Sequence, residues 1–537
     1  MAFQVKDVYA GSSVLLTGGT GFLGKVIVEK LLWTIDEIEN IYLMIRTRKG
    51  KNPNERLAGL LHDPLFNRIR QIKPDAFNKL VAVGGDMMVE NLGMDPEDMK
   101  LIRDNVNVVI HSAATVKFDE HLRAAVTMNV IGTKRIIDLC HQIKDLKVLV
   151  HVSTAYANCD RFETVERIYK SPIPPQKLVD AISWMDDETL TKITPKVLGL
   201  RPNTYTLTKA LAESTIESEA KDIPVIIIRP SIVGAMWQGP LPGWTDNING
   251  PTGIFTAVGR GVLTNMCGSS ESKADIIPVD VVANMIIAAA SHRVSINPTE
   301  IPVIHCSSGE INPLYWGYIV VFLEQFYKKV YPMEQCFSVP STYFHKSRTL
   351  FLLSYYIKHH IPAAISDISA RFVGKRKNNV KLYGKVWKMI ETLHFFTTRG
   401  WSFNANGMPA LYERMTPEDQ KEYNFDVRQV DWDSYLFDYV MGIKKYLLKE
   451  NLENLERSRA HLCRLRLKRQ IIAALVYAGA ISTFGRKWKK ATQYMTWIGA
   501  MLATYTYTEV SFRRRIPLKS LKDYAQTADY SRYLHRN

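Results

Sequence analysis

The sequence contains few cysteines, and they show no paired arrangement. The six Cys are spread over 537 residues without a C-x-x-C motif or a regular spacing. This excludes a disulfide-stapled scaffold and a conventional zinc ribbon, and it favours a reducing compartment. His359 and His360 are adjacent, but no acidic or Cys partner lies nearby at ligand spacing, so we expect no metal site. The first residues also lack the basic start and apolar run of a secretory signal.

The C-terminal region lacks an apolar run of clear membrane-spanning length. Its two apolar stretches, 471–485 and 494–507, are shorter than the about 20 residues needed to cross a bilayer core. The net charge is +16, and residues 451–537 alone hold 17 Lys or Arg against five Asp or Glu. A nearly neutral body with a basic tail does not fit a nucleic-acid groove. We therefore expect no nucleic-acid partner and favour contact with an anionic membrane surface.

Basic clusters flank both apolar stretches, at 464–469, 486–490 and 513–515. If positive charge stays on the cytosolic side, neither stretch crosses the membrane without carrying a basic cluster to the other side. A shallow hairpin or interfacial helices would keep all three clusters on the cytosolic side. Extending the second stretch to 491–508 gives a marginal single span, and a buried helix pair in a soluble domain is a third alternative. We predict a basic, apolar, membrane-associated tail over 464–537.

Short apolar segments alternate with helical lengths through the first half of the chain. After the first segment, apolar residues between Phe22 and Leu32 recur at the spacing of an amphipathic helix. Strands separated by helices indicate βαβ units and a parallel sheet that is covered on both faces. The sequence therefore predicts a doubly wound α/β fold of the Rossmann type, with strands at 14–17, 41–46, 80–86, 106–114, 148–153 and 224–230.

A glycine-rich turn follows the first expected strand. Gly18, Gly21 and Gly24 stand three residues apart, between that strand and the amphipathic helix. Glycines at this place allow a tight turn, a close approach of the backbone to a pyrophosphate, and close packing of helix on strand. The N–H groups at the start of the helix then face the phosphates. Glycines alone are weak evidence, but this context predicts a dinucleotide site.

The end of the second strand indicates which dinucleotide binds. An Asp or Glu is usual there for a free ribose 2′-hydroxyl, whereas this chain has Arg46, Arg48 and Lys49 and no acid. Cations suit a 2′-phosphate, so we expect NADPH rather than NADH, with a solvated loop as the alternative role of Arg48 and Lys49. Asp86, which closes the third strand, is placed to meet the adenine edge or to form a plain turn.

Tyr205 and Lys209 are one helical turn apart, so both side chains lie on one helix face. A phenol has a reference pKa near ~10, and we expect the nearby ammonium to lower this pKa towards the range of a general acid or base. Lys209 can also hold the nicotinamide ribose. A Y-x-x-x-K pair is common on protein surfaces, but the hydroxyls of Ser153 and Thr154 at a strand end favour a catalytic group here.

Four motifs carry a resemblance to a known family. They are TGGTGFLG at 17–24, HSAATVKFDE at 111–120, VSTAYAN at 152–158 and PNTYTLTKALAE at 202–213. The chain resembles extended short-chain dehydrogenase/reductases and, more narrowly, the alcohol-forming fatty acyl-CoA reductases of animals and plants. The likeness extends over about 14–450. It implies an NADP-binding extended reductase domain with substrate insertions at 1–320 and a mostly helical C-terminal module at 345–450.

The resemblance implies an NADPH-dependent oxidoreductase that reduces long-chain acyl-CoA through an aldehyde to a primary alcohol and free CoA. Tyr205, Lys209 and Thr154, or Ser153 in place of Thr154, are the implied catalytic residues. Cofactor contacts are implied at Thr17, Gly18, Thr20, Gly21, Phe22, Leu23, Gly24, Arg46, Arg48, Asp86, Ala113, Ala114 and Lys209. The implied location is the cytosolic face of an intracellular membrane, at the endoplasmic reticulum or the peroxisome. A homodimer is one assembly that would be compatible with the resemblance. The alternatives are a reductase of sterols or other hydrophobic carbonyls and a cofactor-binding membrane scaffold without turnover.

Overall fold

The computed structural model describes residues 2–296, 298, 300–374, 378–486 and 488–513, and the chain forms two compact units. Each unit is assembled from three separate stretches of the chain. The first contains Met1–Asn247, Lys273–Leu314 and Gly400–Asp431, and the second contains Ile248–Ser272, Tyr315–Arg399 and Trp432–Asn537. The sequence analysis expected three consecutive domains, at 1–320, 345–450 and 464–537, and these limits remain a prediction.

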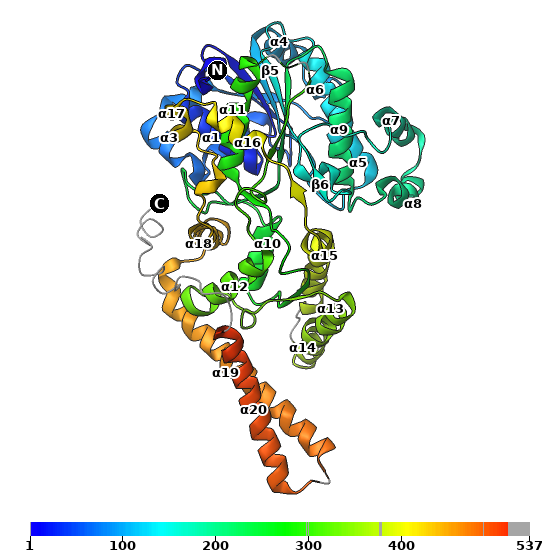
Figure 1. The fold of residues 1–537 in the computed structure, drawn as a ribbon, viewed down its shortest axis with the longest axis vertical. Helices are drawn as coiled ribbons and strands as arrows, with labels where there is room; N and C mark the ends of the chain where they lie inside the picture. The colour runs from blue at the N-terminus through cyan, green and yellow to red at the C-terminus, as the bar shows by residue number, and fades with distance from the viewer. Residues whose placement is uncertain (1, 297, 299, 375–377, 487, 514–537) are drawn as a thin grey trace. The chain divides into compact units, whose positions relative to one another are not determined.

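The first unit is built on a seven-stranded sheet (Figure 1). Its strand order is β11-β7-β5-β4-β1-β2-β3, and every neighbouring pair is parallel. The strands are β1 (Ser13–Thr17), β2 (Ile41–Ile45), β3 (Leu80–Gly84), β4 (Val106–His111), β5 (Val148–Val152), β7 (Val225–Pro230) and β11 (Val303–Cys306). This confirms the α/β class and the six expected strands, and it adds β11, which the sequence analysis did not predict.

The order of the strands places a topological switch point between β1 and β4. From β1 the chain moves outwards to β2 and β3, then returns to β4 and continues through β5, β7 and β11 on the other side. In open parallel sheets, ligands bind outside the carboxyl ends of the strands at such a point. All five residues of β1 are buried, as expected for a strand that is covered on both faces.

Helices cover both faces of this sheet. α1 (Phe22–Thr34) packs on α11 (Val279–Ser295), α6 (Gly132–Cys140) packs on α9 (Thr204–Glu219), and the two pairs lie on opposite sides of the strands (Figure 1). The other helices are α2 (Pro53–Leu61), α3 (Asn67–Ile72), α4 (Pro96–Asn105), α5 (Leu122–Val126), α7 (Pro175–Trp184), α8 (Asp187–Leu198), α16 (Gly407–Glu413) and α17 (Pro417–Glu422). Two short parallel pairs lie outside the main sheet, β6 (Glu163–Thr164) with β13 (Ser402–Phe403) and β8 (Ile232–Gly234) with β10 (Ile276–Pro278).

The second unit is mostly helical. Its helices are α10 (Pro251–Gly259), α12 (Trp316–Gln325), α13 (Arg348–Tyr355), α14 (Ile361–Phe372), α15 (Asn379–Thr398), α18 (Trp432–Gly442), α19 (Leu455–Phe484) and α20 (Lys490–Arg513). Its strands, β9 (Asn265–Cys267) and β12 (Tyr343–His345), form a parallel pair. A π-helical turn at Tyr356–His360 joins α13 to α14, so that residues 348–372 form one continuous helix that packs on α15.

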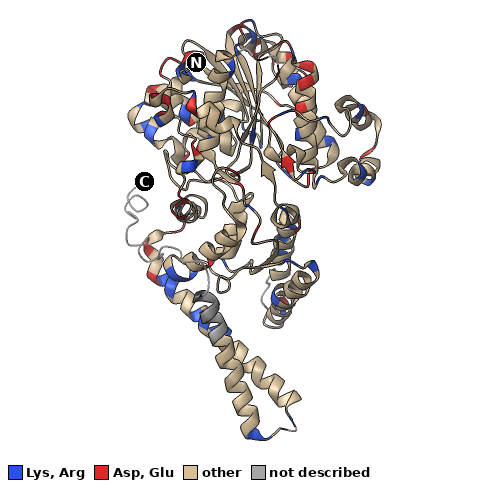
Figure 2. Cartoon of the chain, viewed as in Figure 1, with Lys and Arg blue, Asp and Glu red and all other residues tan. Residues whose placement is uncertain are grey.

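The last two helices form a hairpin. α19 and α20 lie side by side (Figure 1), and the Trp497 indole donates a hydrogen bond to the carbonyl oxygen of Ala474 (3.0 Å). The hydroxyls of Tyr477 and Thr504 are 2.7 Å apart across the same contact. Figure 2 shows Lys and Arg at the turn of the hairpin and few charged residues along the two helices next to that turn.

Most of the described apolar side chains of this hairpin are exposed. Leu475 on α19 and Met495 on α20 have exposed fractions of 68% and 70%. The alternative of a buried helix pair in a soluble domain is therefore wrong. Within the described residues, no helix combines the length and the apolar character needed to span a membrane. The marginal span expected at 491–508 is thus not supported.

Candidate active site

The glycine turn between β1 and α1 leaves no room for side chains at two positions. Gly18 has a φ of +76°, and a Cβ there would lie 2.9 Å from the Ala113 backbone nitrogen. A Cβ on Gly24 would collide with the carbonyl oxygen of Gly18. α1 begins after Gly21 without a side-chain cap, so its first N–H groups point to the space where an anion would bind. This turn fits the pyrophosphate of a dinucleotide.

The ends of β1 and β4 are tied together beside this turn. The buried hydroxyl of Thr17 accepts a hydrogen bond from the Ala113 N–H (3.1 Å) and lies 2.8 Å from Nδ1 of His111. Burial, and then the charge of Lys209, lower the pKa of His111 to about 3, so this histidine stays neutral. Ala114 is half-buried directly after Ala113. Cofactor contacts of Thr17, Ala113 and Ala114 stay predictions.

Thr20, Phe22 and Leu23 lie around the start of α1. Phe22 stacks on Trp244, with ring centroids 5.3 Å apart and planes 22° apart, so part of its ring is used in packing within the unit. Thr20 and Leu23 are half-buried. The hydroxyl of Thr20 accepts a long hydrogen bond from Arg56 (3.4 Å), a residue that the sequence analysis did not consider.

Three guanidinium groups gather after β2. Arg46 and Arg48 are exposed, and Arg56 on α2 donates a hydrogen bond to the carbonyl oxygen of Arg46 (2.5 Å). Burial and the like charges of Arg46 and Arg48 lower the pKa of Arg56. The signal for Arg56 was the capping box of Asn52 and Glu55, which starts α2 at Pro53, a short loop after the end of β2, and so places Arg56 in the first turn of the helix. Such a cluster suits a phosphate.

Asp86 follows β3 and is half-buried. Its Oδ1 accepts a hydrogen bond from the Met88 N–H (3.0 Å), and its own N–H donates to the carbonyl oxygen of Leu92 (2.6 Å). Asp86 therefore stabilises a turn, which was the alternative to a contact with adenine. The contact with adenine stays a prediction, since the second carboxylate oxygen is compatible with either role.

Tyr205 and Lys209 lie on the first two turns of α9. The side chain of Asn203 caps this helix and so fixes where it begins. Tyr205 is half-buried, and its ring stacks on Phe118, with centroids 5.8 Å apart. Lys209 is buried, and its ammonium donates a hydrogen bond to the carbonyl oxygen of Val152, the last residue of β5 (2.7 Å). The helix thus brings both side chains to the carboxyl end of the sheet.

The pKa values of this pair differ from the expectation. Burial raises the pKa of Tyr205 to about 12, and a hydrogen bond with Thr154 acts in the opposite direction. Burial lowers the pKa of Lys209 to about 8, and the charge of Glu213 offsets part of this change. The expectation that Lys209 lowers the pKa of the phenol was wrong, because its ammonium is directed to Val152 and desolvation dominates at Tyr205. A protonated phenol is the form that donates a proton in a reduction.

Ser153 and Thr154 follow β5 but have different partners. The Ser153 hydroxyl donates a hydrogen bond to Oε1 of Glu213 (2.5 Å), and Glu213 also accepts two from the guanidinium of Arg229 (2.8 and 2.6 Å). All three side chains are buried. The Thr154 hydroxyl, in contrast, donates a hydrogen bond to the carbonyl oxygen of Pro230 and accepts one from the Tyr156 N–H (3.3 Å each), and it lies near enough to the Tyr205 phenol to lower its pKa. The structure therefore brings Thr154 to Tyr205 and Lys209, and it places Ser153 in a neighbouring ionic network.

Sequence reasoning missed both charged members of that network. The signal for Glu213 was its spacing, since it follows Tyr205 and Lys209 by further helical turns and lies on the same face of α9. The signal for Arg229 was its place in the buried strand Val225–Pro230, where a charge requires a partner. Among the described residues, no group of three His, Cys, Asp or Glu could hold a metal ion.

Comparison with known proteins identifies relatives along most of the chain. The family described as "Male sterility protein" matches residues 16–286, and a second family with the same description matches residues 358–450. The chain is 41% identical to fatty acyl-CoA reductase 1 of Rattus norvegicus and 37% identical to fatty acyl-CoA reductase 2 of Bos taurus. Each comparison covers 86% of this chain and 90% of the relative.

A solved structure shares the fold. The reductase (R) domain of a non-ribosomal peptide synthetase from Mycobacterium tuberculosis is 18% identical, with a TM-score of 0.54 over 82% of this chain and 92% of that domain. At this identity the likeness concerns the fold alone. The glycine turn and the match over residues 16–286 together indicate a nicotinamide cofactor. On the extent of its identity with the two curated relatives, the chain belongs to the fatty acyl-CoA reductase family.

Proposed function

We propose that this protein reduces long-chain fatty acyl-CoA to a primary alcohol, with NADPH as the reductant and free CoA as the second product. The observation that carries the proposal is the arrangement of Thr154, Tyr205 and Lys209 at the carboxyl end of β5, in the unit that also contains the glycine turn. The substrate class comes from the relatives, which are named fatty acyl-CoA reductases.

The first unit has residues suited to each part of NADPH. The glycine turn and the N-terminus of α1 suit the pyrophosphate, and the guanidinium groups of Arg46, Arg48 and Arg56 suit the 2′-phosphate. Lys209 is placed to hold the nicotinamide ribose. When bound there, NADPH supplies hydride to the substrate carbon.

The chain's own side chains stabilise the oxyanion and supply the proton. Tyr205, with Thr154, donates a hydrogen bond to the thioester oxygen and stabilises the negative charge that develops on it during reduction. Transfer of the Tyr205 proton to this oxygen gives a thiohemiacetal. Its carbon–sulfur bond then breaks as the hydroxyl returns the proton to Tyr205, so that CoA leaves as the thiolate and an aldehyde remains. In the second reduction, Tyr205 donates its proton to the aldehyde oxygen, which gives the alcohol. No step uses a cysteine.

The proposal is tested by product identification. Purified protein is incubated with NADPH and a panel of acyl-CoAs of different chain length, and the lipid products are identified by mass spectrometry. We expect primary alcohols that match the acyl chains supplied. The proposal would be refuted if the protein reduced a sterol ketone and none of the acyl-CoAs. It would also be refuted if the protein bound the cofactor and formed no reduced product.

The choice of NADPH depends on the arginines after β2. Changing Arg46 and Arg48 together to Ala should weaken NADPH binding by about tenfold or more, because charge-assisted contacts to the 2′-phosphate are lost. NADH affinity should hardly change, since the glycine turn is untouched. Fluorescence titration measures both affinities, and Arg70→Ala, an exposed arginine on α3, is the control. Equal weakening of both cofactors would show that these arginines do not contact the phosphate.

The lowered pKa of Lys209 predicts a pH dependence of cofactor binding. Below about pH 8 the side chain is an ammonium, and above this pH it loses its proton and its charge. NADPH affinity should therefore fall as the pH rises through about 8. Lys209→Met, which carries no charge at any pH, should bind NADPH weakly and without this change. An identical pH profile for wild type and Lys209→Met would contradict the role of Lys209.

We further propose that residues 464–537 hold the protein on the cytosolic face of an intracellular membrane. Residues 464–469 lie near one end of the exposed hairpin, whereas Arg486, Lys489 and Lys490 lie at its turn, about 30 Å farther along α19. Insertion by the turn would carry basic residues into hydrocarbon, so the hairpin suits a position flat in the interface. A flat position keeps the clusters at 464–469 and 486–490 on one side of the membrane, and residues 514 and 515 of the third cluster lie outside the described residues. The organelle, endoplasmic reticulum or peroxisome, stays open.

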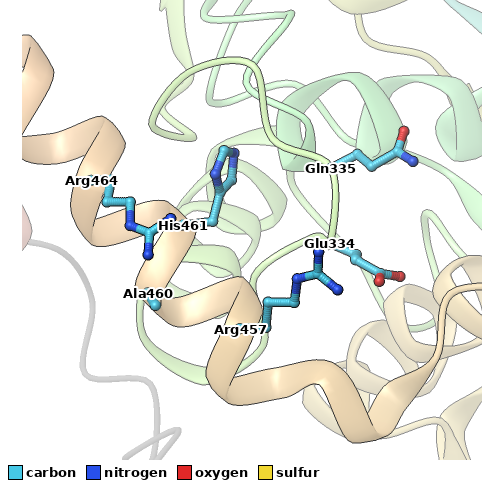
Figure 3. Close-up of a pocket in the computed structure, with 6 residues that line it drawn as sticks. All are labelled: Glu334, Gln335, Arg457, Ala460, His461 and Arg464. Carbon is cyan, nitrogen blue, oxygen red and sulfur yellow. The ribbon is translucent and has the colours of Figure 1, made fainter.

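A basic pocket at the start of α19 supports this position. It has a volume of about 480 Å³ and is lined by Glu334, Gln335, Arg457, Ala460, His461 and Arg464 (Figure 3). Arg457, His461 and Arg464 come from one face of α19. Arg464 precedes the exposed Ile471 by seven residues, about 10 Å along the helix. With the apolar side chains in the interface, the guanidinium groups of Arg457 and Arg464 would be available to lipid phosphates.

Removal of residues 464–537 should release the protein from membranes. The truncated chain keeps the glycine turn, Thr154, Tyr205 and Lys209, so it should still reduce a short, water-soluble acyl-CoA. Its rate on long-chain substrate in vesicles should fall, because enzyme and substrate no longer share a surface. Cell fractionation and the two rates measure this. A truncated chain that stays with the membrane fraction would disprove the anchoring role of the tail.

A further inference from the structure

The continuous helix Arg348–Phe372 in the second unit has one buried apolar face. Phe351, Tyr355 and His359 follow each other at four-residue intervals and are 1–3% exposed. The rings of Phe351 and Tyr355 lie against Trp387 of α15, with centroids 5.9 and 4.8 Å apart. The Tyr355 hydroxyl donates a hydrogen bond to the carbonyl oxygen of Tyr383 (2.8 Å). This face accounts for the packing of the helix within its unit.

The same helix has a second apolar stripe that no described residue of its own unit covers. Its members recur at intervals of three or four residues, and all are exposed: Leu350, Leu353, Ile357, Ile361, Ile365, Ile368 and Phe372. Ile365 is 62% exposed and Phe372 is 87% exposed. The stripe spans 23 residues, about 33 Å. Soluble monomers rarely expose a contiguous apolar patch of this kind, and such patches mark interaction surfaces.

The exposed charged residues of this helix itself are all basic. They are Arg348, Lys358 and Arg371, and Arg348 forms an ion pair with Glu391 of α15 (3.1 Å). Its one acid, Asp367, is buried, and its two oxygens accept hydrogen bonds from the N–H groups of Asn379 and Val380 (3.0 Å each). A long apolar stripe bordered by cations complements an anionic bilayer surface. A second copy of the same face would bring the same excess of positive charge, from Lys358 and Arg371, to the contact.

We propose that this helix is a second membrane-contact element, lying in the plane of an anionic lipid interface with the stripe in the acyl region. The proposal rests on the second unit alone and holds whether or not the reaction is the one proposed above. It differs from the tail because residues 348–372 precede the hairpin by about 100 residues and have their own apolar surface and cations. The helix gives the enzyme a second, independently placed anchor on lipid.

A fluorescent label on the stripe tests the proposal directly. Cys463 is the exposed cysteine of the chain and the other five are buried, so full-length Cys463→Ser offers a background for labelling. An environment-sensitive fluorophore is attached to Ile365→Cys, or to Ile72→Cys on α3 as a control of similar exposure (62% and 65%). Vesicles of phosphatidylcholine with phosphatidylserine should shift the emission at 365 to the blue, and brominated acyl chains should quench it. The label at 72 should show neither effect.

Substitutions measure what the stripe contributes. Ile365→Gln, Ile368→Gln and Phe372→Gln together should lower the affinity of the full chain for these vesicles by at least about tenfold. The matched control changes three exposed apolar residues of the first unit, Ile72, Trp184 and Leu200, to Gln and should keep the affinity. Circular dichroism verifies that both variants fold.

Three results would overturn the proposal. The label at 365 could remain in water while the protein binds vesicles, or the protein could fail to bind them at all. A blue shift at 365 that needs no vesicles and grows with protein concentration would show that a second copy of the chain covers the stripe. Each of these outcomes leaves the identity of the reaction product unchanged, so it is distinguishable from failure of the proposed function.

Discussion

Replacement of Tyr205 by Phe is expected to lower alcohol formation by a factor of about 10²–10⁴, the range typical of a lost general acid. The Phe ring keeps the stacking on Phe118, and nothing in the glycine turn or the arginine cluster changes. Burial raises the pKa of the phenol to about 12, so Tyr205 carries its proton across the working pH range, and the variant has no proton to donate. The rate is measured at saturating NADPH, and NADPH affinity, which should survive, is measured separately.

Tyr9→Phe is the matched control for this variant. Tyr9 is buried, and its hydroxyl donates a hydrogen bond to the carbonyl oxygen of Ile287 on α11 (3.0 Å). This variant also loses a buried hydroxyl and should cost about 1 kcal/mol of stability, with the rate unchanged. If Tyr205→Phe kept a tenth or more of the wild-type rate, the assignment of Tyr205 as the proton donor would be wrong.

Replacement of Glu213 by Gln is expected to destabilise the first unit by about 3–5 kcal/mol, because it leaves the buried guanidinium of Arg229 without its counter-charge. Both side chains are at most 2% exposed, so water cannot take over the role of the carboxylate. A second effect follows from the position of Glu213 on α9. Its charge raises the pKa of Lys209, so its removal should lower that pKa further and move the alkaline loss of NADPH affinity to lower pH.

A double-mutant cycle separates the ion pair from other effects. Arg229→Met alone should also be costly, whereas Glu213→Gln with Arg229→Met removes both charges and should cost less than the sum of the single changes. The exposed pair of Glu188 and Lys192 on α8 is the control, and Glu188→Gln should change stability by no more than about 0.5 kcal/mol. Additive losses in the cycle, measured by denaturant unfolding, would show that the buried pair has no coupling.

The sheet and the glycine turn could be predicted because local patterns determine them. An apolar run that ends in Gly18 and is followed by helical spacing specifies a strand, a turn and a helix within about 20 residues. β11 escaped prediction because it is a four-residue strand, Val303–Cys306, with a histidine in its centre. The division of the chain into two units, each built from alternating stretches, was also not predicted, because it depends on contacts between residues far apart in the chain.

The candidate site was predictable in its residues and not in its electrostatics. The spacing of Tyr205 and Lys209 placed them on one face of a helix, as the structure has them. Their pKa values depend on burial and on which neighbour each group meets, and neither is visible in a spacing. Ser153 and Thr154 illustrate the same limit, because adjacent hydroxyls at one strand end donate to different acceptors, the Glu213 carboxylate and the Pro230 carbonyl oxygen.

The decisive measurement is the number of NADPH molecules oxidised for each CoA thiol released. Conversion of a thioester to an alcohol takes two hydrides and frees one thiol, so a purified enzyme that acts as proposed gives a ratio of two with primary alcohol as the lipid product. NADPH oxidation is followed by absorbance and the thiol by a colorimetric reagent in the same sample. A ratio of one with free aldehyde, or NADPH oxidation without release of thiol, would contradict the reduction of acyl-CoA to alcohol.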